Sequence, residues 1–272
     1  MTQDQAGQGQ ARRIDTSVAH PARIYDYWLG GKDNFQADRD AGDMVVGYFP
    51  DILTGVRMNR AFLRRAIHYL AAEAGIRQFL DIGTGLPTGN NTHEVAQAAA
   101  PESRIVYVDN DPMVLLHAQM LLTSTSEGAC DYLEADIRDT RAILQAAAKT
   151  LDFTRPVAIS LLMILMFIPD GDDPWGIVGT LLDAVPPGSY LVISHPANDV
   201  DEGQIETAYD ELNTRMGGVE VKLRDHAQIL RFFDGTELVE PGLVQLHRWR
   251  PGTGIGGNGN DIPAYAGVGR KP

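Results

Sequence analysis

Three aspartates are the residues of this chain whose type and spacing could bind a nucleotide-like molecule. Asp81 lies in the segment FLDIGTG, Asp109 follows RIVYV, and Asp136 follows DYLEA, and each segment has the pattern of a short strand. The carboxyl ends of successive parallel strands meet at one edge of a sheet, so the three carboxylates would gather there. After the second strand a carboxylate could accept hydrogen bonds from both hydroxyls of a ribose, and after the third a polar group could accept one from an adenine amino group. Each aspartate taken alone could equally cap a helix.

The loop that begins at Asp81 reads DIGTGLPTG, and a helix is predicted to follow it. Gly83 and Gly85, with Thr84 between them, would let the backbone approach a ligand where a Cβ atom would be in the way. The dinucleotide fingerprint G-x-G-x-x-G also requires a glycine at position 88, which is Thr88, so the loop does not favour an NAD(P) site. A plain turn between strand and helix is the other alternative.

Composition limits the classes of partner and location. The net charge of −13 disfavours an extended nucleic-acid surface. The single cysteine, Cys130, permits no internal disulfide, and its apolar neighbours indicate a small core residue. The longest apolar segment is too short to span a bilayer, and no signal sequence opens the chain, so we expect a cytoplasmic protein without a membrane partner.

Three regions are predicted along the chain. Residues 1–13 are rich in Gln, Gly and Ala without periodicity, which indicates a disordered tail. Residues 14–75 are predicted to form an N-terminal helical cap, including helices over 37–49 and 52–74. Residues 76–272 then form the cofactor-binding domain.

This larger domain alternates between strands and helices. A parallel, doubly wound α/β sheet with right-handed crossovers is therefore expected. Its five parallel strands are predicted at residues 78–82, 104–108, 130–135, 156–162 and 189–194. Two further strands, over 244–249 and 264–269, flank a glycine-rich loop that we expect to be mobile. They would form a closing hairpin and complete a Rossmann-like sheet of seven strands, one of them antiparallel.

Taken together, these motifs resemble class I S-adenosylmethionine-dependent methyltransferases. They are similar in particular to a bacterial S-adenosyl methyltransferase family formerly catalogued as a domain of unknown function. The resemblance implies S-adenosylmethionine as the cofactor, bound by Asp81, Gly83, Gly85, Asp109, Asn110 and Asp136. By their positions, Thr84 in the glycine loop and Ile137 beside Asp136, which could pack on an adenine face, are added to the predicted cofactor contacts. The segments that carry it are RIYDYWLGGKDNFQADR (23–39), VRMNRAFLRRA (56–66), FLDIGTGLPTGNNTHEVAQ (79–97), RIVYVDNDPMVL (104–115) and ELVEPGLVQLHRWRP (237–251).

Few residues indicate the methyl acceptor. The fourth strand continues as SLLMILMF (160–167), without the Asp/Asn-Pro-Pro-aromatic motif of enzymes that methylate adenine or glutamine amino groups. A small-molecule acceptor is therefore the leading prediction. His195 follows the fifth strand and is a candidate general base, although a structural role is the alternative. Acidic residues at 170, 172 and 173 are better explained as a solvated loop, so no metal site is predicted.

The N-terminal segment is the expected source of further substrate contacts. Gly30 and Gly31 could let it fold across the pocket as a lid. In this hypothesis Tyr27, Lys32 and Asn34 face the pocket, and Asn59 and Arg60 add contacts from the next helix; alternatively, Tyr27 simply packs on the sheet domain.

Two other functions remain open at this point. An S-adenosylmethionine-binding regulatory or interaction protein without catalysis is one, because no general base stands out in the sequence. An NAD(P)-dependent oxidoreductase is the other. The sequence specifies neither the acceptor nor the oligomeric state.

Overall fold

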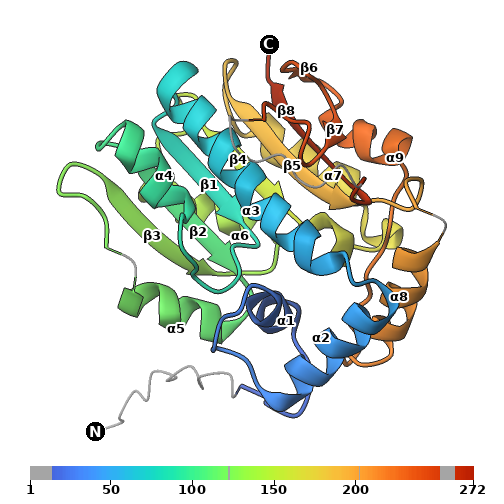
Figure 1. Ribbon diagram of the computed structural model, residues 1–272. Coiled ribbons are helices and arrows are strands. Elements are labelled where there is room, and N and C mark those ends of the chain that lie inside the picture. Colours follow the sequence, from blue (N-terminus) through green and yellow to red (C-terminus); the bar gives the residue numbers. More distant parts are fainter. Residues whose placement is uncertain (1–13, 122, 202, 252–260) are drawn as a thin grey trace, which may run out of the picture.

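The computed structural model describes residues 14–121, 123–201, 203–251 and 261–272. Its centre is a mixed eight-stranded sheet in the order β3-β2-β1-β4-β5-β8-β6, with β7 also paired to β8 (Figure 1). The predicted disordered tail and the glycine-rich loop at 252–260 lie outside the described residues.

The predicted parallel strands are confirmed, because the five segments pair in parallel within one sheet. They are β1 (Gln78–Ile82), β2 (Arg104–Asp109), β3 (Ala129–Glu134), β4 (Ala158–Leu162) and β5 (Tyr190–Pro196). In β1 every residue is buried, as expected for a strand covered on both faces. The register places Asp81 between Tyr107 of β2 and Ser160 of β4, so its side chain belongs to the centre of the sheet.

The C-terminal strands differ in part from the prediction. β8 (Ala264–Arg270) runs antiparallel to β5, as expected. The strand predicted at 244–249 is confirmed only over its first two residues, β7 (Val244–Gln245), and an unpredicted two-residue strand, β6 (Glu237–Leu238), also pairs with β8. Pro241 and Gly242 lie between them, and proline has no N–H for a strand ladder. This interruption explains why eight strands occur where seven were predicted.

Helices cover both faces of the sheet (Figure 1). On one face α3 (Ile52–His68), its continuation Tyr69–Glu73 and α4 (Thr92–Ala99) pack against residues such as Phe79 and Ile105. On the other, α6 (Thr140–Ala147), α7 (Pro174–Asp183) and α9 (His226–Leu230) pack against residues such as Leu80 and Val106. Phe79 and Leu80 are neighbours in sequence, as are Ile105 and Val106. Because successive side chains along a strand point to opposite faces of the sheet, each face has its own hydrophobic core. The remaining α5 (Pro112–Leu121) lies beside β2 and β3.

A cap lies beyond the carboxyl ends of the parallel strands (Figure 1). It consists of α1 (Pro21–Trp28), α2 (Gln36–Tyr48) and α8 (Gln204–Asn213), which share an apolar core of their own. The cap therefore contains a helix from the second half of the chain, which the sequence did not indicate. Within it α1 begins at Pro21, because proline suits the first turn of a helix and His20 accepts the N–H of Ala22 at 3.3 Å.

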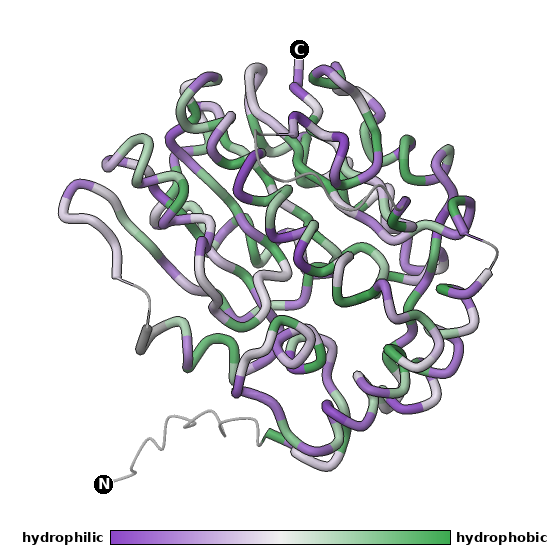
Figure 2. Tube along the Cα trace, in the orientation of Figure 1, coloured by the Kyte–Doolittle hydropathy of each residue, from purple (hydrophilic) through white to green (hydrophobic). Residues whose placement is uncertain are grey.

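Hydropathy follows this architecture. Figure 2 shows the hydrophobic residues concentrated along the central strands and on the inner sides of the helices that cover them. Within the described ranges, no helix combines the length and apolarity that crossing a membrane requires.

Candidate functional site: a cavity between the sheet and the cap

A large cavity separates the carboxyl ends of the parallel strands from the cap. Its volume is about 1570 Å³, including the open space at its mouth. Strand ends contribute Asp81, Gly83, Gly85 and Asp109, and α1, α3 and α8 contribute the opposite walls. The predicted ligand-binding edge of the sheet thus faces a partly open cavity that is lined by both polar and apolar residues.

Glycine is required at position 83. Its φ is +77°, and a Cβ atom added there would lie 2.6 Å from Ile164, which follows β4. Gly85 has a φ of +66°, and its N–H donates to the Asp109 carboxylate at 2.8 Å. Thr84 donates its hydroxyl to the carbonyl of Asp81 at 3.1 Å. These hydrogen bonds fix the loop so that its backbone faces the cavity and lies close to the end of β2.

Asp81 is a buried brace within this loop. Its two carboxylate oxygens accept hydrogen bonds from the hydroxyls of Thr92 at 2.6 Å and Ser160 at 2.8 Å. Burial raises the pKa of Asp81 above its usual value, while these hydrogen bonds oppose the shift. The same side chain therefore joins β1, β4 and the start of α4. It also borders the cavity, beneath the loop over residues 83–90, which we call the ligand-binding loop because it is predicted to bind the cofactor.

Asp109 keeps hydrogen-bonding capacity for a ligand. One oxygen accepts the Gly85 N–H and the other accepts the Asp111 N–H at 3.0 Å. A carboxylate oxygen has a second lone pair, so each can accept one more donor. Burial raises the pKa of Asp109. Asn110 is exposed and also borders the cavity.

The third predicted strand end has a different environment. Asp136 forms an ion pair with Arg138 at 3.1 Å, and Arg138 also contacts Asp172 at 2.7 Å. Ile137 is buried in the sheet core. Neither Asp136 nor Ile137 borders the described cavity, so their assignment to the adenine remains a prediction.

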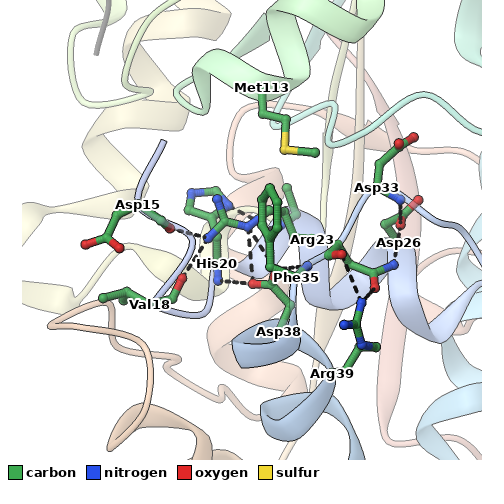
Figure 3. Close-up of polar contacts among 12 residues, drawn as sticks. Asp15, Val18, His20, Arg23, Asp26, Asp33, Phe35, Asp38, Arg39 and Met113 are labelled. Carbon is green, nitrogen blue, oxygen red and sulfur yellow. Dashed lines mark hydrogen bonds and ion pairs between the residues drawn. The ribbon is translucent and has the colours of Figure 1, made fainter. Parts of the chain in front are cut away.

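A buried ion pair fixes α1 to α2. The Nε of Arg23 lies 3.1 Å from Asp38, and its guanidinium donates to the carbonyl of Val18 at 2.7 Å (Figure 3). Asp38 also accepts the backbone N–H groups of His20 and Phe35. This network holds the first turn of α1 over the cavity.

One further contact joins the cap to the ligand-binding edge. The Nδ1 of His20 lies 3.1 Å from the Asp111 carboxylate. Asp111 is two residues beyond the predicted ribose-binding Asp109, so the start of α1 lies next to that position. His20 was not predicted as part of the site, although its place directly before Pro21 indicates a helix cap.

Asn59 and Arg60 both border the cavity, and their contact with a substrate stays a prediction. The Asn59 amide donates to the Tyr25 hydroxyl at 2.9 Å, and its oxygen accepts from Ser194 at 2.7 Å. Arg60 donates to the carbonyls of Gly89 and Asn90 in the ligand-binding loop. Asn59 thus connects the cap to the end of β5, and Arg60 supports the loop.

The other predicted lid residues do not border this cavity. Tyr27 donates its hydroxyl to Asp43 at 2.7 Å on the surface, and Asn34 donates to Asp26 at 2.9 Å. Lys32 is exposed and borders a second, more open cavity beside the loop. The prediction that Tyr27, Lys32 and Asn34 face the main cavity is therefore wrong.

Helical phase explains the difference. In α1 the residues that border the cavity are Pro21, Ala22, Ile24, Tyr25, Asp26 and Trp28. Arg23 and Tyr27 do not border it, and with about 3.6 residues per turn these two lie together on the other side of the helix. Spacing alone did not separate the two tyrosines, because Ile24, Tyr27 and Trp28 also follow a helical pattern.

We expect Tyr25→Phe to lower methyl-transfer turnover roughly three- to tenfold, because it removes the hydroxyl that Asn59 and the Val56 carbonyl share. The matched control is Tyr27→Phe, which removes a hydroxyl that bonds only to a surface aspartate and should change turnover by less than about twofold. Steady-state kinetics on both variants makes the comparison. A larger loss for Tyr27→Phe than for Tyr25→Phe would contradict this placement of the helix.

The His195 side chain is not accessible to a substrate and so is not placed to act as a general base. It is fully buried, its Nδ1 lies 2.7 Å from the Pro196 carbonyl, and its Nε2 lies 2.9 Å from Arg224. Nδ1 therefore carries the proton and Nε2 accepts from the guanidinium. Burial lowers the pKa of His195 to about 3. His195 does not border the cavity, so it is no longer a candidate base. Its role is structural, because its Nε2 is a hydrogen-bond partner of the buried Arg224 guanidinium.

His195 should make stability depend on pH. The folded protein keeps this imidazole neutral down to about pH 3, whereas the unfolded chain takes up a proton below about pH 6.5. The free energy of unfolding is expected to fall with decreasing pH across that window, by up to about 1.4 kcal/mol per pH unit from this group. Burial also lowers the pKa of His20 and His93, which act in the same direction.

Urea unfolding at several pH values between about 7.5 and 4.5 measures this dependence. In the His195→Gln variant the slope should decrease, whereas the exposed His68→Gln control should keep the wild-type slope. Equal slopes in wild type and His195→Gln would refute the assignment.

The geometry fits S-adenosylmethionine. Gly83 and Gly85 supply a backbone cradle that a Cβ at position 83 would fill, which suits the amino-acid part of the cofactor. Asp109 offers free lone pairs at the end of β2, which suit ribose hydroxyls. The cradle and the carboxylate border the same cavity.

Comparison with known proteins agrees with this fit. Among solved structures, a DUF574 family protein from Streptomyces avermitilis is 49% identical over 96% of this chain and 100% of its own, with a TM-score of 0.92. A candidate methyltransferase from Thermobifida fusca is 40% identical over 94% and 96% of the two chains, with a TM-score of 0.86. No curated protein matches. The sequence profile of the S-adenosyl methyltransferase family matches residues 7–272. The chain therefore belongs to the S-adenosyl methyltransferase family and is an enzyme that uses S-adenosylmethionine as its methyl donor.

Proposed function

We propose that this enzyme methylates a small molecule that binds inside the cavity, under the cap. The observation that carries the proposal is the continuity of the cavity. The ligand-binding loop after β1 and the inner surface of α8 border the same space, and α1 covers it. A polymeric acceptor would have to enter beneath the cap helices, whereas a small molecule fits there.

In this proposal the two ends of the cavity bind different molecules. Gly83, Thr84 and Gly85 hold the amino-acid part of the cofactor, and Asp109 and Asn110 hold its ribose. Asp136 and Ile137 remain the predicted contacts of the adenine. The opposite end, which we call the acceptor chamber, is bordered by Trp28, Phe49, Ile205, Tyr209, Leu212 and Met216.

Bound S-adenosylmethionine supplies a methyl group on a sulfonium, which is already a good leaving group. The residues of the chain then have to orient the acceptor and exclude water. Tyr25 and Tyr209 border the cavity, and burial raises the pKa of each, so both stay neutral at physiological pH. With His195 outside the cavity, we expect acceleration from orientation rather than from proton transfer to a side chain.

A radioactive methyl group shows which class of molecule the enzyme methylates. The enzyme is incubated with S-adenosylmethionine carrying a tritiated methyl group and an extract of bacterial cells, and the products are separated by ultrafiltration. We expect enzyme-dependent label in the small-molecule filtrate. Label confined to retained protein or nucleic acid would contradict the proposal. Absence of label from both fractions, with tight binding of S-adenosylhomocysteine, would favour the regulatory alternative.

A further inference from the structure

The acceptor chamber differs in chemistry from the rest of the cavity. Its six residues are apolar or aromatic and come from α1, α8, the segment that follows α8 and the turn after α2. All six belong to the apolar core that the cap helices share. A molecule in the chamber would therefore replace apolar contacts within the cap.

The ionisable acidic and basic side chains that border the cavity are held at its other end. Asp81 and Asp109 lie at strand ends, and Arg60 is bound to the carbonyls of the ligand-binding loop. His20 contacts the carboxylate beyond β2, and Asp26 accepts the N–H of Asp33 in the loop after α1. Among the described residues, the chamber itself offers no charge to an acceptor. A charged acceptor would be desolvated there without a counterion from the side chains of the chamber, which is costly.

One polar group in the chamber has no partner. Tyr209 is only 6% exposed, and within the described part of the chain its hydroxyl makes no hydrogen bond. The neighbouring Tyr25 hydroxyl, in contrast, already donates to Val56 and accepts from Asn59. The Tyr209 hydroxyl is not one of the polar atoms that are sealed off without a partner, so it is accessible from the cavity and free to bond with a ligand there.

We infer that the methyl acceptor is an uncharged, mainly apolar molecule, and that the Tyr209 hydroxyl binds its single hydrogen-bonding group, a hydroxyl, in the acceptor chamber. In the transfer the bond between the methyl carbon and the cofactor's sulfur breaks and a bond between that carbon and the acceptor oxygen forms. The hydroxyl proton passes to water at the open mouth of the cavity, so S-adenosylhomocysteine and the methylated product both leave without added charge. This inference rests on the proposed function, because it names the class of small molecule that the enzyme methylates. Tyr209 is a specificity-determining residue in this account. It selects a polar atom at one point of an apolar ligand.

Calorimetry with three probes of one ring skeleton tests the inference on the enzyme saturated with S-adenosylhomocysteine. The probes are 2-naphthol, the carboxylate 2-naphthoate, and 2-methylnaphthalene. We expect 2-naphthol to bind roughly three- to tenfold more tightly than 2-methylnaphthalene, because its hydroxyl can form a hydrogen bond with the Tyr209 hydroxyl. The carboxylate should bind at least about tenfold more weakly than 2-naphthol.

Tyr209→Phe removes only the hydroxyl and should reduce 2-naphthol binding to the level of 2-methylnaphthalene. Binding of 2-methylnaphthalene and of S-adenosylhomocysteine should not change. Tyr48→Phe, at an exposed tyrosine outside the cavity, is the matched control. Preference for 2-naphthoate, absence of binding by the neutral probes, or equal 2-naphthol binding in wild type and Tyr209→Phe would each overturn the inference.

The experiment with the tritiated methyl group distinguishes failure of the uncharged-acceptor inference from failure of the proposed small-molecule methylation. At neutral pH the labelled small-molecule product should pass into an organic solvent. Label that stays in the water phase of the filtrate would overturn the uncharged acceptor while leaving small-molecule methylation intact. Label only on retained polymers would overturn both.

Discussion

Gly83→Ala is expected to weaken S-adenosylhomocysteine binding by at least about tenfold. Two effects combine, because the added Cβ would lie 2.6 Å from Ile164 and the residue has a φ of +77°. The left-handed conformation costs a residue with a Cβ roughly 1–2 kcal/mol. The loop can relieve both only by moving away from Ile164, and this movement displaces the backbone that faces the cofactor. Calorimetric titration of wild type and variant measures the loss.

Gly89→Ala is the matched control within the same loop. An added Cβ at position 89 has no heavy atom within 4 Å, and its φ is not positive. It should bind S-adenosylhomocysteine within about twofold of wild type. If Gly83→Ala binds as tightly as Gly89→Ala, the loop does not hold the cofactor as we describe.

Asp109→Ala is expected to produce the other large effect, a loss of cofactor affinity on the order of 100-fold. Hydrogen bonds to a charged group contribute roughly 1.5–3 kcal/mol each, and a ribose offers two hydroxyl donors. The substitution also releases the N–H of Gly85, which Asp109 accepts at 2.8 Å, and so loosens the glycine loop. Both consequences weaken the same complex.

The control for this variant is Asp210→Ala, which removes an equal charge from the exposed side of α8. Titrating S-adenosylhomocysteine into both proteins separates a local contact from a change in overall charge. Thermal unfolding of each variant without ligand shows whether the fold is retained. An Asp109→Ala protein that is folded and binds with wild-type affinity would exclude the ribose contact.

Local sequence patterns predicted the sheet and the cofactor end of the site. The strand, the glycine loop and the acidic residue after β2 each depend on neighbours in sequence, and the parallel pairing of β1 with β2 then brings Gly85 to Asp109. A short motif can encode such an arrangement, because its parts are positioned by hydrogen bonds within the sheet.

The acceptor end could not be predicted in the same way. Tyr209 reaches the cavity because α8 packs on α2, a contact between segments far apart in the chain that leaves no local pattern. The choice of Tyr27 over Tyr25 had a different cause, since Ile24, Tyr27 and Trp28 also share one helical face, and only the packing of α1 shows which face borders the cavity. His195 looked accessible because it ends a strand, yet Arg224 from a distant segment covers it.

A crystal structure of the enzyme with S-adenosylhomocysteine tests the central claim most directly. Our account predicts the ribose hydroxyls on Asp109, the homocysteine against Gly83 and Gly85, and the sulfur facing the acceptor chamber beside Tyr25 and Tyr209. If the sulfur instead faced solvent, or if the ligand bound away from this cavity, small-molecule methylation under the cap would be contradicted.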